Sequence, residues 1–79
     1  MALPIRVAPL GDEWTVQAPG LTEDLIFRAG GKAETAARAL AARFADEGRT
    51  AELKIYLRDG SLAGSFVYPS RGPTTTPAW

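Results

Sequence analysis

The chemistry open to this chain is narrow, because its 79 residues include no histidine and no cysteine. A general base or nucleophile would have to be a carboxylate or a lysine with a shifted pKa. Asp12, Glu13, Glu23 and Asp24 lie in or beside expected turns, where acidic side chains are ordinarily solvated, and their spacing matches no calcium-binding loop. We therefore expect a protein that is not an enzyme and that has no metal site and no cofactor.

The segment Gly30-Gly31-Lys32 has the composition of a phosphate-binding loop, since glycines before a helix expose backbone N–H groups to an anion. A Walker loop also needs a glycine five residues before the second of these glycines and a serine or threonine after the lysine. Ile26 and Ala33 occupy those two positions. We therefore interpret the segment as a connection into a helix with a solvated lysine.

Basic and aromatic side chains offer a different chemistry, which is binding. In the predicted fold, a helix covers one face of a β-sheet and the side chains along each strand alternate between the two faces. This alternation places four basic residues, one tyrosine and no acid on the face that points away from the helix. The candidate binding residues on this face are Arg6, Arg28, Lys54, Tyr56 and Arg58. Arginine and lysine can contact phosphates while tyrosine stacks on a base, as in proteins that bind nucleic acid on a sheet.

Two other interpretations of this face remain open. One face of a half-solvated antiparallel sheet is normally polar, so the charges can simply be hydrated. Ile26, Tyr56, Ala63 and Val67 would also be exposed there, which suits a protein partner or a second copy of the chain. We expect a non-catalytic binding domain whose partner is a protein, including itself as a homo-oligomer, with nucleic acid as the alternative.

Charge and hydropathy limit the partners and the cellular location that we expect for this protein. Nine basic and nine acidic residues cancel, so the net charge favours neither nucleic acid nor an anionic membrane as a partner. No apolar run approaches the length of about 20 residues that spans a bilayer, and the first residues lack the pattern of a signal peptide. We expect a cytoplasmic protein without membrane contact.

The dipeptide Asp59-Gly60 predicts how the second half of the chain folds. It separates two apolar stretches, 52–57 and 62–68, and favours a two-residue type I′ hairpin with Leu57 opposite Leu62. This register sorts the two strands into two faces. The face expected to point inward carries Leu53, Ile55, Leu57, Leu62 and Phe66.

Three further strands and one helix are expected. Alternation predicts strands at 5–8, 14–18 and 24–28, with Trp14 in the core, and alanine-rich helical spacing predicts a helix over 33–47 that ends at a left-handed Gly48. We expect Leu40 and Phe44 to hold this helix against the sheet. Their expected neighbours are Leu53, Ile55, Phe66 and Trp14.

These elements define the fold class. The order β-β-β-α-β-β predicts a two-layer α+β domain over residues 1–69, with one helix packed on an antiparallel sheet. Residues 70–79 contain three threonines and two prolines and predict a flexible tail, in which Trp79 is either disordered or docks on its own domain or on a neighbour.

The order of several short motifs resembles that of a known family. Trp14-Thr15-Val16 after a Gly-Asp turn, Ala37-Arg38-Ala39-Leu40-Ala41, Arg58-Asp59-Gly60 and Tyr68-Pro69 are similar to the pattern of the bacterial and phage domain-of-unknown-function family 2188. The chain departs from that pattern at Glu13, where the family has glycine, and at Ala29-Gly30, where it has Thr-Lys. The resemblance implies a small α+β fold and no activity.

Overall fold

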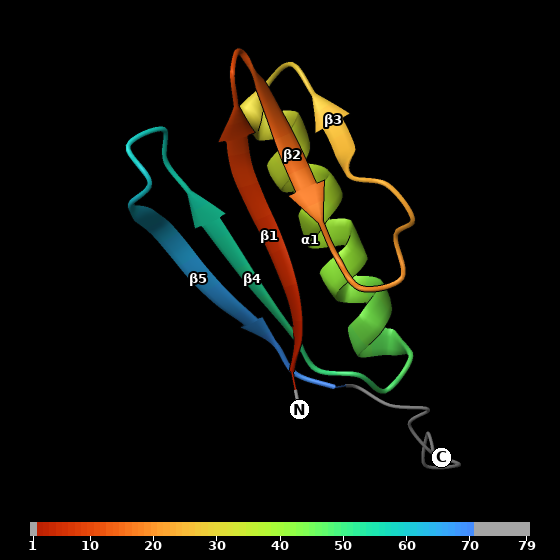
Figure 1. Ribbon diagram of the computed structural model, residues 1–79. Coiled ribbons are helices and arrows are strands. Elements are labelled where there is room, and N and C mark those ends of the chain that lie inside the picture. Colours follow the sequence, from red (N-terminus) through yellow and green to blue (C-terminus); the bar gives the residue numbers. More distant parts are fainter. Residues whose placement is uncertain (1, 71–79) are drawn as a thin grey trace, which may run out of the picture.

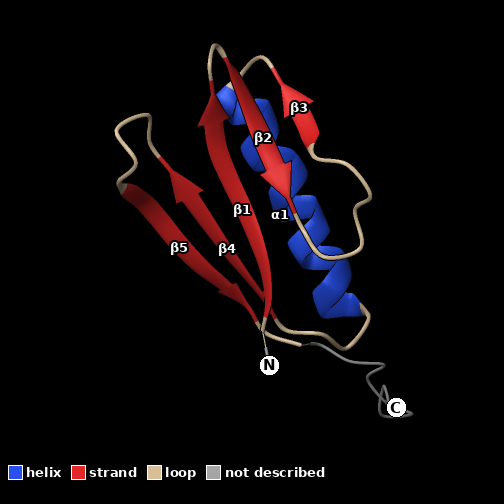
Figure 2. Ribbon diagram, in the orientation of Figure 1, coloured by secondary structure: helices blue, strands red, loops and turns tan. Residues whose placement is uncertain are grey.

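The computed structural model describes residues 2–70, which form one helix and a five-stranded sheet. The sheet order is β3-β2-β1-β4-β5, and the single helix lies against one face of it (Figures 1 and 2). The elements, in chain order, are β1 Leu3–Leu10, β2 Glu13–Gln17, β3 Leu25–Phe27, α1 Gly30–Asp46, β4 Ala51–Tyr56 and β5 Leu62–Tyr68. The predicted α+β class and element order are confirmed. The tail beyond residue 70, with Trp79, lies outside the described residues.

The sheet is mixed, so the prediction of an antiparallel sheet was wrong. β1 lies at the centre, where it pairs antiparallel with β2 and parallel with β4. In the parallel pair Ile5 neighbours Leu53 and Arg6 neighbours Lys54. The helix between β3 and β4 carries the chain from one edge back to the middle of the sheet, which lets β4 run beside β1 in the same direction.

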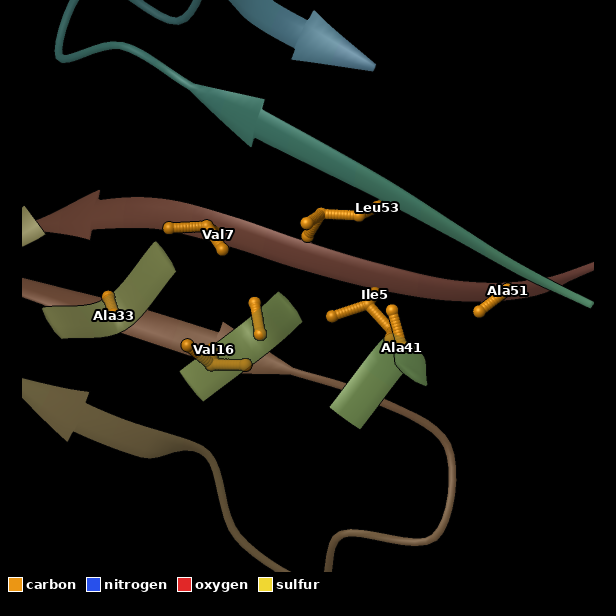
Figure 3. Packing of buried hydrophobic residues seen from close by; sticks show 8 residues of the cluster. Ile5, Val7, Val16, Ala33, Ala41, Ala51 and Leu53 are labelled. Atoms are coloured by element: carbon orange, nitrogen blue, oxygen red, sulfur yellow. The ribbon is translucent and has the colours of Figure 1, made fainter. Parts of the chain in front are cut away.

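An alanine stripe sets how close the helix lies to the sheet. Ala33, Ala37, Ala41 and Ala45 are fully buried, four residues apart along α1. The first three of them belong to one core cluster with large side chains of the central strands, among them Ile5, Val7, Val16 and Leu53 (Figure 3). Because methyl groups take little room, the helix backbone can approach the strands closely.

Leu40 and Phe44 occupy the rim of this core, which corrects their expected neighbours. Both are half-buried and pack against the cluster, but they line a hollow with Pro19, Gly20 and Leu21 at the connection that follows β2. The stripe of alanines points at the sheet, so the two larger side chains flank it on one side. Leu40 and Phe44 therefore lie on the side of the helix that faces the β2–β3 connection, and not at the centre of the helix–sheet contact beside Leu53.

Both helix ends follow local rules. Ala29 precedes the helix in an extended conformation and makes no side-chain capping bond, and the helix begins at Gly30, three residues before the predicted start. At the other end Gly48 has a φ of 86°, its N–H donates to Ala45 O, and the Arg49 N–H donates to Phe44 O at 2.8 Å. This pair of bonds is a Schellman motif, which confirms the left-handed cap predicted at Gly48.

The β4–β5 turn differs from the predicted one. Gly60 N–H donates to Leu57 O and Gly60 has a φ of 88°, whereas no non-glycine residue between 2 and 70 has a positive φ, so Asp59 does not have the positive φ that a type I′ turn requires. Leu57 N–H donates to Ser61 O, so the loop has three residues and the type I′ prediction was wrong. Leu57 therefore does not pair with Leu62.

A β-bulge restores the predicted register further along. Tyr56 pairs with Leu62 and Ile55 pairs with Gly64, which leaves Ala63 as an extra residue in β5. From this point the predicted pairs hold, including Lys54 with Ser65 and Leu53 with Phe66. One added residue in the loop and one in the strand thus compensate each other.

Candidate interaction surface

Three of the five candidate binding residues come together on the sheet face opposite the helix. The guanidinium carbon of Arg6 lies 4.7 Å from the centroid of the Tyr56 ring. Lys54 is the cross-strand neighbour of Arg6, and its Nζ lies 3.8 Å from Glu52 Oε1. Arg6, Lys54 and Tyr56 therefore form a compact group on β1 and β4, which we call the open-face group.

Arg58 lies at one end of this group, beside the β1–β2 turn. Its guanidinium lies 5.5 Å from the Trp14 ring and donates a hydrogen bond to Gly11 O. Arg58 also lines a hollow with Arg6 and Tyr56. It thus joins the loop after β4 to the turn after β1 while staying next to the open-face group.

Arg28 is separated from the open-face group. It follows the end of β3 at the opposite edge of the sheet and lines a hollow with Leu10, Gly11, Asp12 and Glu13. The sheet order places β2 and β1 between β3 and β4. Arg28 therefore has acidic neighbours in place of the basic ones that were expected.

The expectation of an acid-free face was wrong as well. Glu52 shares the face of Lys54, because it stands two residues away on the same strand and between buried Ala51 and Leu53. Glu13 shares the face of Thr15 on β2 by the same alternation. The Lys54–Glu52 pair is exposed, with side-chain exposures of 44% and 36%, so it contributes little to stability.

Several exposed apolar side chains lie on β5 and on the loop that precedes it. Leu57, Leu62, Phe66 and Val67 are four of the seven large hydrophobic residues that are exposed among residues 2–70. We call these four side chains the hairpin patch. Their exposures run from 40% for Phe66 to 60% for Val67. Strand alternation predicts that Val67 is exposed, which is confirmed. It also predicts that Leu57, Leu62 and Phe66 point inward and are covered, which is wrong.

The position of the helix explains the exposure of Phe66. α1 packs on β1, β2, β3 and β4, while β5 lies at the far edge of the sheet (Figure 1). From the helix, Arg38 reaches β5, where its guanidinium carbon lies 4.7 Å from the Phe66 ring centroid. Leu62 points to the open face, because it pairs with Tyr56 and cross-strand partners share a face.

Two ionisable groups have pKa values displaced by hydrogen bonds. Ser61 Oγ and the Ser61 N–H both donate to Asp59 Oδ1, at 2.6 and 2.8 Å, and these bonds lower the pKa of the Asp59 carboxyl. Arg38 Nη1 donates to the Tyr68 hydroxyl at 3.3 Å, and this bond raises the pKa of the guanidinium. Both groups stabilise local structure, one in the loop and one between helix and strand.

Comparison with family models, with curated proteins and with solved structures finds no match for this chain. The resemblance to domain-of-unknown-function family 2188 stays a prediction. Within residues 2–70 no helix is long and apolar enough to cross a bilayer. The same part of the chain contains no group of three or more acidic side chains placed to hold a metal ion.

Proposed function

We propose that this domain is a non-catalytic binding domain whose partner is a protein, and that the hairpin patch is the contact surface. The observation that carries the proposal is the concentration of exposed apolar side chains on β5 and on the loop that precedes it. Neighbouring exposed apolar groups mark contact sites, because covering them removes apolar area from water. A cytoplasmic location belongs to the same proposal and is supported by the absence of cysteine.

The residue types around the patch support a protein partner. Protein interfaces are enriched in aromatic residues and arginine at their centres. Tyr56 carries Arg6 on its ring, and Phe66 carries Arg38 on its ring, each at 4.7 Å. Side chains that already stack on one another lose less conformational freedom when a partner binds.

Nucleic-acid binding through the open-face group is the alternative. Arg6 and Lys54 are adjacent there and Tyr56 offers a ring for stacking. The ion pair of Lys54 with Glu52 and the engagement of Arg58 at Gly11 reduce the charge that this face can offer to phosphates. We therefore rank this alternative second.

A photo-crosslinking amino acid at Leu62 tests the proposal in the native host cell. The matched control is the same amino acid at Leu10, which is 59% exposed against 50% for Leu62 but lies at the β1–β2 turn. We expect a protein adduct from position 62 that is absent or much weaker from position 10. Equal adducts from both positions, or none from position 62, would contradict the proposal.

Salt dependence separates the alternative from the proposal. Binding to DNA or RNA through Arg6 and Lys54 would weaken steeply as salt rises, and replacing both by alanine would flatten that dependence by up to about two phosphate equivalents. Tyr56→Ala should be the more damaging change if the surface binds a protein. Gel-shift titrations at several salt concentrations supply the measurement.

A further inference from the structure

The strand β5 is the outermost strand of the sheet on the side of the hairpin patch. Its seven residues, Leu62–Tyr68, pair with β4 along one edge, and the sheet order places no strand of residues 2–70 along the other. The strand contains no charged residue and no proline. Edge strands usually carry such residues, because they prevent pairing with another chain. β5 is therefore free to accept a further strand.

Both faces of this strand are apolar and exposed. Phe66 points to the helix side, because it pairs with buried Leu53. Val67 points to the open side with its partner Glu52, and Leu62 does so with Tyr56. An added strand would be able to cover apolar side chains above and below the sheet, as well as completing the backbone pairing.

The opposite edge of the sheet lacks these properties. β3 has only three residues, Leu25–Phe27, and lies between charged Asp24 and Arg28. Asp24 Oδ2 also accepts a hydrogen bond from Gln17 Nε2 at 3.0 Å, which holds this charge beside the strand. A short strand bounded by charges is a poor template for pairing.

We infer that the occupant of this edge is a second copy of the chain, whose β5 pairs antiparallel with the first about a two-fold axis. This inference rests on the proposed function and names its partner. Recognition of a foreign strand would be specified by charges along the edge, and Leu62–Tyr68 carries none. An uncharged strand is instead compatible with itself, because no antiparallel register places like charges opposite each other within it.

The aromatic side chain of β5 favours one register. With Phe66 opposite Phe66 of the second copy, the two rings form a cross-strand pair, and Val67 lies opposite Ser65 of that copy. A register centred on Ser65 would instead place Phe66 opposite Gly64, which has no side chain to pair with it. The Phe66-centred register is therefore the favoured one.

The resulting dimer has one continuous sheet. A two-fold axis perpendicular to the sheet keeps both helices on the same face and joins two five-stranded sheets edge to edge. Stable interfaces bury about 800 Å² on each partner. Backbone pairing along one strand is too narrow for this alone, so Phe66 on one face and Leu62 and Val67 on the other supply the remaining contact.

Sedimentation velocity over a range of protein concentrations tests the dimer. The chain has a mass of 8.4 kDa, and we expect the wild type to sediment at twice that mass. Val67→Lys should return it to the single-chain mass with an unchanged circular dichroism spectrum. Leu10→Lys is the matched control, since Leu10 is 59% and Val67 60% exposed, and it should leave the dimer intact. A wild type that stays monomeric at all concentrations, or a Val67→Lys variant that remains a dimer, would overturn the inference.

Disulfide formation tests the register, because the chain has no cysteine of its own. An oxidised mixture of Ser65→Cys and Val67→Cys proteins should form mainly mixed disulfides. Ser65→Cys alone should form few. Efficient cross-linking of Ser65→Cys alone would overturn the Phe66-centred register, and the absence of any cross-link would overturn pairing through β5.

Different results would contradict the proposed protein-binding function and the proposed dimer. A monomeric wild type together with an adduct at position 62 to a different protein would overturn the second copy and leave the proposed function standing. A monomeric wild type without any protein adduct would overturn both. An adduct at position 62 with twice the mass of the chain would support both.

Discussion

Arg38 and Phe66 join the helix to the outermost strand of the sheet. The Arg38 guanidinium carbon lies 4.7 Å from the Phe66 ring centroid, and Arg38 Nη1 donates to the Tyr68 hydroxyl at 3.3 Å. A single helix residue therefore contacts two aromatic side chains of β5, at the place where the alanine stripe no longer covers the sheet.

Replacing Arg38 should loosen this edge of the domain. We expect Arg38→Ala to lower the free energy of unfolding by a small but measurable amount, since an exposed cation–aromatic contact and a hydrogen bond are lost. Arg43→Ala, at an exposed position of the same helix, should cost less. Urea denaturation followed by circular dichroism gives both values, and equal costs would show that the contact with Phe66 contributes nothing. Tyr68→Phe isolates the part due to the hydrogen bond.

The two glycines of the first helical turn should respond in opposite directions to alanine. A Cβ on Gly30 would lie 3.0 Å from Trp14 Cε2, whereas a Cβ on Gly31 would meet nothing within 4 Å. Gly31→Ala should therefore stabilise the domain by about 0.5–1 kcal/mol through reduced backbone freedom in the unfolded chain. Gly30→Ala should destabilise it, because the Trp14 ring has to move. Thermal unfolding of the two variants provides the comparison, and a stabilising Gly30→Ala would show that the ring gives way freely.

The alanine stripe should tolerate no larger side chain. Ala37 is fully buried between the helix and the sheet, so Ala37→Leu should cost about 1–3 kcal/mol through overpacking. Ala39 is exposed on the same helix, and Ala39→Leu should change stability by less than about 0.5 kcal/mol. Chemical denaturation of the two leucine variants measures the difference. Similar values would mean that the helix can move away from the sheet at little cost.

The Asp59 carboxyl should make the β4–β5 loop sensitive to acid. Its pKa lies below the ordinary value of 3.8 because the Ser61 hydroxyl and N–H donate to it in the folded chain. A lowered folded pKa gives stability that is present above the ordinary pKa and is lost as the pH falls through the folded value. Ser61→Ala should raise the Asp59 pKa toward its ordinary value, and Ser61→Thr should retain most of the shift. Carboxyl titration by NMR measures both, and an unchanged pKa in Ser61→Ala would assign the effect to the backbone N–H alone.

Local patterns in the sequence were sufficient for the elements and for part of the candidate surface. Alternation identified the strands, alanine spacing identified the helix, and Gly48 identified its end, because each signal acts within a few residues. The same alternation placed Arg6, Lys54 and Tyr56 on one face, since all three lie inside regular strands. It did not predict that Arg28 lies beside Asp12 and Glu13 or that Arg58 contacts Gly11 and Trp14, because Arg28 and Arg58 lie beyond strand ends, where the two-residue period no longer applies.

Only the tertiary structure decided which strands are neighbours and what the helix covers. The parallel pairing of β1 with β4 joins segments separated by the helix, and no local signal encodes that choice. The buried alanines place α1 over the central strands, which leaves Phe66 of the edge strand β5 exposed on the helix side, while Leu62 and Val67 are exposed on the open face. The uncharged run Leu62–Tyr68 was the one sequence signal for this edge. An apolar side chain is buried by its position in the assembled layers as much as by its face of the strand, and that position depends on contacts distant in sequence.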